Sequence, residues 1–228
     1  MSKHLHYILG VSLGTGIQPT AVAVLEHEVW RSVNWEPETV ALRLRYLERI
    51  PLDAGYPDTI ERIDTLLKTA GIKDEECDEN PDVVLDVTGS GRAPVELFER
   101  AEIEPILVTI TGATALEEET KPDDWRIPKV ELIGNLQVMY QTGRLKMAKD
   151  LDLVPTLVDE LRDFKMRPPR LDPSDPETWR EGQFDDLVFA VALSAWRASR
   201  HVPTPQVVRD HRKEVQEKHR KEMIRYIV

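Results

Sequence analysis

The chain has 228 residues, of which 41% are hydrophobic and 31% charged, and its formal net charge is −11. This length suffices for one large domain with a sizeable core. No apolar run reaches the roughly 20 residues of a membrane helix, and the single cysteine, Cys77, excludes an internal disulfide. An acidic chain is not a general nucleic-acid binder, because phosphate contacts rely on Lys and Arg. Residues 206–228 differ from the rest, with seven Lys or Arg against four Asp or Glu.

Hydrophobic periodicity predicts strands first and then alternating helices and strands. Alternation with a period of two indicates half-buried strands, and apolar residues three and four apart indicate amphipathic helices. The predicted strands cover residues 7–11, 20–25, 40–50, 82–87 and 105–110, and the predicted helices cover 57–67, 95–101, 130–141, 153–164 and 185–199. Three strands followed by helix, strand, helix and strand predict an α/β fold, with a mixed central sheet flanked by helices.

The remaining segments are polar. We expect residues 111–128 to be irregular and mobile, and residues 201–228 to form a polar, partly basic tail, helical and solvated, after a domain that spans residues 1–200. The six histidines lie near the termini and in one hairpin. Their spacing suggests no zinc site, so we expect them on the surface.

The strongest chemical signal is a set of three carboxylates. Asp86 ends the apolar run over residues 82–86, and a run of small residues, 87–91, follows it at once. Asp185 and Asp186 stand directly before the apolar run over residues 187–196. In open α/β sheets the ligand crevice lies beyond the carboxyl ends of the strands. Carboxylates gathered there suit a hard cation such as Mg²⁺ or Mn²⁺.

Ordinary structural roles are the alternative for each acid taken singly. Asp185 can cap a helix N-terminus, where the helix dipole favours negative charge by about 0.3–1 kcal/mol. Asp86 can stabilise a turn. A cap needs only one acid, however, so the adjacent pair together with Asp86 favours a metal site. Such sites hold two ions about 3.5–4 Å apart and cleave phosphodiesters. The first strand is the natural source of another carboxylate, but it carries Ser12.

Several motifs in order resemble one known family. The residues that carry the resemblance are 8–14 (ILGVSLG) with 19–21 (PTA), 47–52 (LERIPL) with 56–57 (YP), 84–91 (VLDVTGSG), 108–112 (VTITG), 127–129 (IPK), 136–137 (LQ) with 143–146 (GRLK), and 182–190 (GQFDDLVFA). The chain resembles the nuclease domain of the large terminase subunit of tailed bacteriophages, a member of the RNase H-like superfamily. The likeness extends from about Tyr7 to Trp196.

The resemblance implies a fold, an activity and a ligand set. The fold is the RNase H-like mixed sheet, and the activity is Mg²⁺- or Mn²⁺-dependent endonucleolytic cleavage of double-stranded DNA during genome packaging, usually with two ions. Asp86 and Asp186 match ligand positions, and Asp185 is auxiliary. Ser12 stands where the family usually has Asp. That change is a deliberate inactivating substitution, a natural loss of activity, or a change tolerated because another acid moves in.

The family context also implies partners. Lys129, Arg43, Arg45 and Arg49 are candidate DNA contacts, although each also suits a solvated surface. Candidate protein partners are a packaging ATPase, a portal and a small terminase subunit, with no membrane, in the cytoplasm of a phage-infected or prophage-bearing bacterium. The chain has no P-loop motif, so the sequence is either one domain of a larger subunit or a stand-alone product. The rival function is a non-catalytic, nuclease-like module for DNA binding or assembly.

Overall fold

The computed structural model describes residues 2–14, 18–31, 37–69, 80–90, 93–112, 117–164 and 185–200. Its core is one eight-stranded sheet with the order β6-β7-β5-β4-β1-β2-β3-β8. The strands are β1 (Ser2–Ser12), β2 (Thr20–Arg31), β3 (Pro37–Ile50), β4 (Asp82–Asp86), β5 (Ile106–Thr111), β6 (Glu118–Lys121), β7 (Asp124–Pro128) and β8 (Leu145–Met147). β1, β2 and β3 are antiparallel neighbours, whereas β4 and β5 continue the sheet in parallel from β1.

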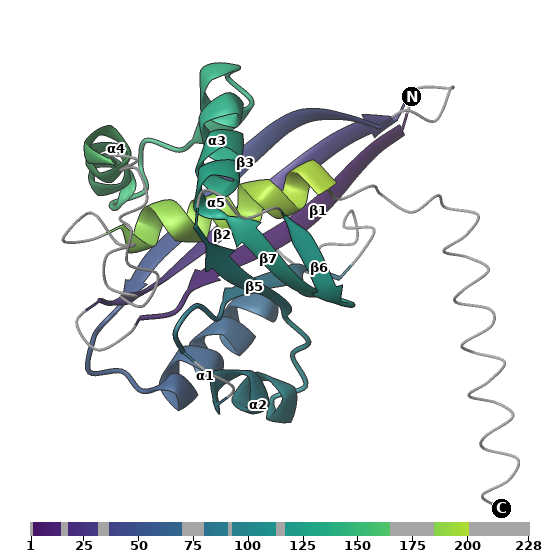
Figure 1. Ribbon diagram of the computed structural model, residues 1–228. Coiled ribbons are helices and arrows are strands. Elements are labelled where there is room, and N and C mark those ends of the chain that lie inside the picture. Colours follow the sequence, from purple (N-terminus) through teal and green to yellow (C-terminus); the bar gives the residue numbers. More distant parts are fainter. Residues whose placement is uncertain are drawn as a thin grey trace, which may run out of the picture.

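Helices cover both faces of this sheet (Figure 1). They are α1 (Tyr56–Leu67), α2 (Ala93–Arg100), α3 (Lys129–Gln141), α4 (Val154–Asp163) and α5 (Asp186–Arg200). One hydrophobic core joins alternate residues of the strands to α3, α4 and α5, and a second joins the intervening residues to α1 and α2. This follows from the period of two in a strand, which sends successive side chains to opposite faces.

Helix α5 packs directly on β1, and a glycine permits the contact. A Cβ placed on Gly10 would lie 2.0 Å from the backbone oxygen of Ala190 and 2.4 Å from Oγ of Ser194. All but three of the residues of α5 are buried, which explains why its sequence is apolar on every side. The first turn of α5 is thereby fixed over the end of β1.

The predicted fold class is confirmed: the sheet is mixed, antiparallel and then parallel, with helices on both faces. The structure adds the central strand order β3-β2-β1-β4-β5. All ten predicted elements are present, but β1 begins five residues before its predicted start and β2 ends six residues after its predicted end. No helix in the described ranges has the length and apolar character needed to cross a membrane. The tail predicted over residues 201–228 lies outside the described residues, as do residues 165–184.

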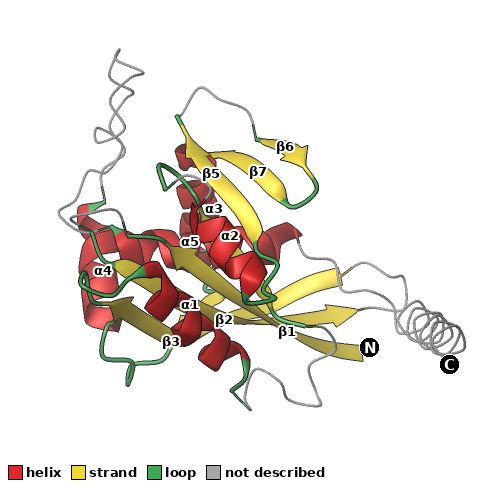
Figure 2. Cartoon of the chain, turned by 90° about the horizontal axis from the view of Figure 1, so that it is seen from below, coloured by secondary structure: helices red, strands yellow, loops and turns green. Residues whose placement is uncertain are grey.

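Two expectations were wrong. Residues 111–128 are not irregular throughout, because β6 and β7 form a hairpin that extends the sheet beside β5 (Figure 2). Every residue of β6 is exposed, so its sequence has no hydrophobic pattern that would predict a strand. Backbone pairing with β7 holds this edge strand in the sheet. The described histidines are not surface residues either: His4, His6 and His27 are buried. His6 and His27 are cross-strand partners, and Asp82 Oδ2 lies 3.1 Å from Nε2 of His6.

Candidate functional site

The register of the sheet places four residues in one row across β4, β1, β2 and β3. Ser12 is the partner of both Asp86 and Ala21, and Ala21 is the partner of Arg49. Paired residues of neighbouring strands share a face and lie about 5 Å apart. This face is the one that α5 covers, because Val84, Ile8 and Leu47, each two or four residues earlier on its strand, belong to the core that includes α5.

Asp86 ends β4 at the carboxyl edge of the parallel part of the sheet. Its carboxylate accepts a hydrogen bond of 2.8 Å from the backbone N–H of Thr88, which fixes the side chain at the start of the turn. The chain turns sharply after it, with Gly89 at a positive φ of 75°. Asp86 is 2% exposed. The predicted strand-end carboxylate is therefore buried and oriented on the covered face.

Asp185 and Asp186 stand at the start of α5, as predicted. The Asp185 carbonyl accepts the N–H of Phe189 at 3.1 Å, so Asp185 occupies the N-cap position and Asp186 the first helical position. Both residues are buried. The chain folds this way locally because the helix N-terminus, with its unpaired N–H groups and positive dipole end, favours acidic side chains.

Asp186, Arg49 and Glu160 form an acid cluster. The sequence singled out Arg49 only as a DNA contact, and it did not single out Glu160. Arg49 donates from Nε to Oδ2 of Asp186 at 2.7 Å and from Nη2 to Oδ1 at 2.9 Å, and Nη2 also bonds to Glu160. Glu160 lies on α4, and its carboxylate also accepts from the backbone N–H of Val188 in α5. Arg49 thus joins β3, α4 and α5. The motif over residues 47–52 contained Arg49, but nothing in the sequence identified its partners.

Burial shifts the ionisation of this cluster. Burial, followed by the charge of Asp186, raises the pKa of Glu160 from 4.5 to about 7, against the opposing effects of Arg49 and the Val188 N–H. Burial lowers the pKa of Arg49, but its hydrogen bond to Asp186 and the charges of Asp186 and Glu160 outweigh burial and raise it overall. The guanidinium remains charged at any relevant pH and serves as the counter-charge of the buried acids.

The candidate DNA contacts lie in different places. Lys129 begins α3, and its Nζ lies 4.9 Å from the ring centroid of Phe164 and 5.4 Å from that of Phe189 in the first turn of α5. Arg43 and Arg45 instead bind Glu26 on the opposite face of the sheet from Arg49, and Arg43 also binds Glu28. The structure brings Lys129 near the first turn of α5, but it does not bring Arg43 and Arg45 into the acid cluster.

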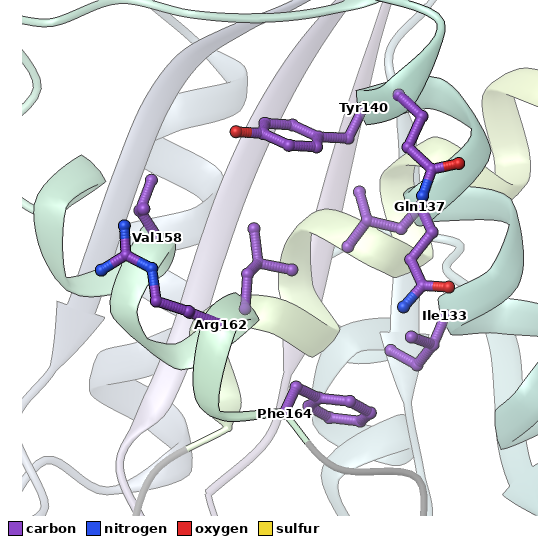
Figure 3. A pocket seen from close by; sticks show the side chains of 9 residues that line it. Ile133, Gln137, Tyr140, Val158, Arg162 and Phe164 are labelled. Carbon is purple, nitrogen blue, oxygen red and sulfur yellow. The ribbon is translucent and has the colours of Figure 1, made fainter.

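A pocket of about 290 Å³ lies between α3 and α4 (Figure 3). Ile133, Gln137 and Tyr140 line it from α3, and Val158 and Arg162 line it from α4. None of the acids of the row or of the start of α5 lines this pocket. It separates two helices that pack against the core and supplies no catalytic group, so the candidate site remains the acid cluster.

The cluster suits one hard cation better than the two that the family resemblance implies. Carboxylate oxygens are suitable ligands, and magnesium commonly binds through one or two carboxylates together with water and substrate phosphate. Asp86 stands at one end of the row, and Asp186 binds Arg49, which stands at the other end. However, the described residues include no group of three or more His, Cys, Asp or Glu arranged to hold a metal ion. Ser12 provides a neutral hydroxyl beside Asp86, and Arg49 already holds both oxygens of Asp186.

No protein-family model and no curated protein matches the sequence. Among solved structures, the large terminase nuclease of thermophilic phage G20c is 19% identical, with a TM-score of 0.48 over 83% of this chain and 81% of that one. The Mn-soaked terminase nuclease domain of human cytomegalovirus is 12% identical, with a TM-score of 0.49 over 85% and 83%. The large terminase nuclease domain of bacteriophage SPP1 with bound Mn is 11% identical, with a TM-score of 0.45 over 84% and 86%. These three solved structures are all terminase nuclease domains.

Proposed function

We propose that this chain is a DNA endonuclease domain of the terminase type, spanning residues 1–200, that cuts double-stranded DNA during genome packaging with Mg²⁺ or Mn²⁺. One observation carries the proposal: Asp86 shares a row and a face of the sheet with Ser12 and Arg49, and Arg49 binds Asp186 at the start of α5. The row thus links the two acids singled out in the sequence, one at each end, and this link supports the proposal. The order and content of the sequence motifs support the same class.

Each residue of the proposed site has a role that its surroundings explain. Asp86 and Asp186 are the cation ligands, and Asp185 supports them at the start of α5. The Thr88 N–H orients Asp86. A divalent cation bound there would lower the pKa of a water molecule and stabilise charge on the scissile phosphate. The burial of Asp86 and Asp186 excludes bulk water, which strengthens electrostatic interactions in the site.

DNA and packaging proteins are the proposed partners. Lys129 is the proposed DNA contact, because it stands against Phe189 in the first turn of α5 and a lysine there can reach a backbone phosphate. Arg43 and Arg45 remain possible contacts outside the acid cluster. A packaging ATPase, a portal or a small terminase subunit is the proposed protein partner, in the cytoplasm of an infected or prophage-bearing bacterium.

Plasmid cleavage in the presence of Mn²⁺ tests the function. We expect Ser12→Asp to cleave at least tenfold faster than the wild-type protein, because it adds a carboxylate beside Asp86 in the same row. Ser12→Asn is the matched control: it has the size of Asp without the charge and should not gain activity. Adding Asp186→Asn to the Ser12→Asp protein should abolish cleavage. Failure of both the wild-type and the Ser12→Asp protein to cut DNA, with normal circular dichroism, would refute the endonuclease proposal.

Metal binding provides a second readout of the same site. Mn²⁺ should raise the melting temperature of the Ser12→Asp protein, because a ligand that binds only the folded state stabilises that state. Asp186→Asn should remove the rise. If the rise persisted unchanged in Asp186→Asn, Asp186 would not be a ligand. Scanning calorimetry with EDTA as the reference measures both effects.

The second candidate function is a non-catalytic module that binds DNA or assists assembly. Two observations favour it: Ser12 replaces the carboxylate that a two-ion site needs, and Arg49 neutralises Asp186. Cleavage by Ser12→Asp but not by the wild-type protein would support this candidate. Cleavage by both would support a working site without the extra carboxylate.

A further inference from the structure

The acid cluster contains its own cation. The guanidinium of Arg49 meets both oxygens of Asp186 in a fork, at 2.7 Å and 2.9 Å, and extends to Glu160. Charge-assisted bonds of this bidentate form are among the strongest hydrogen bonds in proteins. The Asp186 side chain is fully buried and that of Glu160 is 9% exposed, whereas that of Arg49 is 24% exposed. The arginine therefore borders solvent on one side and the two acids on the other.

A second, independent feature is a buried polar group in the row, the hydroxyl of Ser12. Ser12 is 1% exposed, and its Oγ is buried without a hydrogen-bond partner among the described residues. A buried hydroxyl without a partner is costly and calls for an explanation, such as a ligand or water. Ser12 lies between Asp86 and Ala21 in the row that ends at Arg49. A polar occupant bound over the row would meet both this hydroxyl and the acids.

We propose that Arg49 is the resident cation of the acid site and that a divalent cation binds Asp186 only after the Arg49 side chain has moved out. The proposal rests on the proposed function, because it concerns the same carboxylates. The Arg49 fork occupies both oxygens of Asp186, and its positive charge repels a second cation at the same carboxylate, so the guanidinium and the metal compete. The partial exposure of Arg49 gives its side chain a path to solvent, and Glu160 gives it a second anchor while it blocks the site.

If Arg49 and the metal compete, removing the guanidinium should have opposite effects on thermal stability in the absence and in the presence of metal. Without metal, Arg49→Gln leaves Asp186 and Glu160 buried without their counter-charge, so the protein melts at a lower temperature. When Mn²⁺ is added, the melting temperature of the same variant rises by more than that of the wild-type protein, because no guanidinium needs to be displaced. A purely structural arginine would produce the first effect without the second.

The test measures Mn²⁺ affinity by the paramagnetic resonance signal of free Mn²⁺, and melting temperature with Mn²⁺ or EDTA. We expect Arg49→Gln to bind Mn²⁺ at least tenfold more tightly than the wild-type protein. Arg197→Gln is the matched control: the Arg197 side chain is 26% exposed and pairs with Asp82 at 2.5 Å, away from the acid cluster. It should lower the melting temperature and leave Mn²⁺ affinity unchanged. Ser12→Asp reports independently whether the site binds metal.

The outcomes separate this inference from the proposed function. If Ser12→Asp gains Mn²⁺ affinity and folded Arg49→Gln does not, the competition is refuted and the proposed function stands. If no variant binds Mn²⁺, both proposals fail. Should Arg49→Gln not fold, Arg49→Lys replaces it, because lysine keeps the charge but lacks the fork. Arg49→Lys should bind Mn²⁺ several-fold more tightly than wild type, and wild-type affinity in that variant would refute the competition.

Discussion

Replacing Gly10 by alanine tests how closely α5 packs on β1. The added Cβ would lie 2.0 Å from the Ala190 carbonyl oxygen and 2.4 Å from Ser194 Oγ. Non-bonded heavy atoms prefer about 3.5–4.0 Å, so the first contact is short by roughly 1.5 Å. The Ser194 side chain can rotate, but the Ala190 oxygen belongs to the helix backbone, so α5 itself must move.

Overpacking of this kind typically costs about 1–3 kcal/mol, and the backbone clash places Gly10→Ala at about 3 kcal/mol, the upper end. In a domain of this size, the loss corresponds to a fall in melting temperature of roughly 6–12 °C. Urea unfolding followed by circular dichroism measures the loss directly. Gly134→Ala is the matched control: a Cβ there meets nothing within 4 Å, and alanine within a helix is better than glycine by about 0.5–1 kcal/mol.

The two alanine variants should therefore change stability in opposite directions. A free energy of unfolding for Gly10→Ala within about 0.5 kcal/mol of wild type, the range of neutral surface changes, would refute the close packing of α5 on β1. Because Ser12 lies two residues after Gly10 on the same face, a shift of α5 also moves Asp186 relative to the row. Gly10→Ala should consequently weaken Mn²⁺ binding in the Ser12→Asp background.

Two further predictions concern pH. Burial raises the pKa of Asp82, but His6 and Arg197 outweigh it and lower that pKa. Ionised Asp82 therefore contributes to the free energy of unfolding above the unfolded pKa, about 3.9, and this contribution is lost as pH falls through the folded pKa. Asp82→Asn should lower the free energy of unfolding by roughly 1–3 kcal/mol at pH 7 and by less at pH 3.5. An equal loss at both pH values would contradict the lowered pKa. The pKa of Glu160 is shifted in the opposite direction, from 4.5 to about 7. The free energy of unfolding should therefore fall by roughly 3 kcal/mol as pH rises from 4.5 to about 7. In EDTA, Glu160→Gln should remove this fall, and an unchanged pH profile would refute it.

Local sequence pattern determined the order and type of the main elements. The alternation in β3 and the helical spacing of Ile60, Ile63 and Leu66 depend on neighbouring residues alone, so they can be read without the fold. The same holds for the positions of Asp86 at a strand end and of the Asp185–Asp186 pair at a helix start. The prediction that Ser12 stands where the family usually has Asp came from the residues around it, which resemble the family motif.

Three short strands were not predicted from the sequence. β6, β7 and β8 have between three and five residues each, and the exposed β6 carries no apolar stripe. Backbone pairing with a neighbouring strand creates such elements. β6 and β7 pair with each other in a hairpin, whereas β8 pairs with β3, which is remote in sequence. The burial of His6 and His27 has the same origin, because both lie on the face of the sheet that α5 covers and Asp82 of β4 reaches His6.

Tertiary packing alone decided the partners of the site. Arg49 binds Asp186, which is 137 residues away in the sequence, and Glu160, which is 111 residues away. No local sequence pattern predicts contacts between residues so far apart in the chain. Register placed Asp86, Ser12 and Arg49 in one row, and the close contact at Gly10 fixed the start of α5 above it. The sequence by itself therefore named the acids and the missing carboxylate. Which cation already holds Asp186 depended on how β3, α4 and α5 converge, since side chains brought together by packing share no signal along the chain.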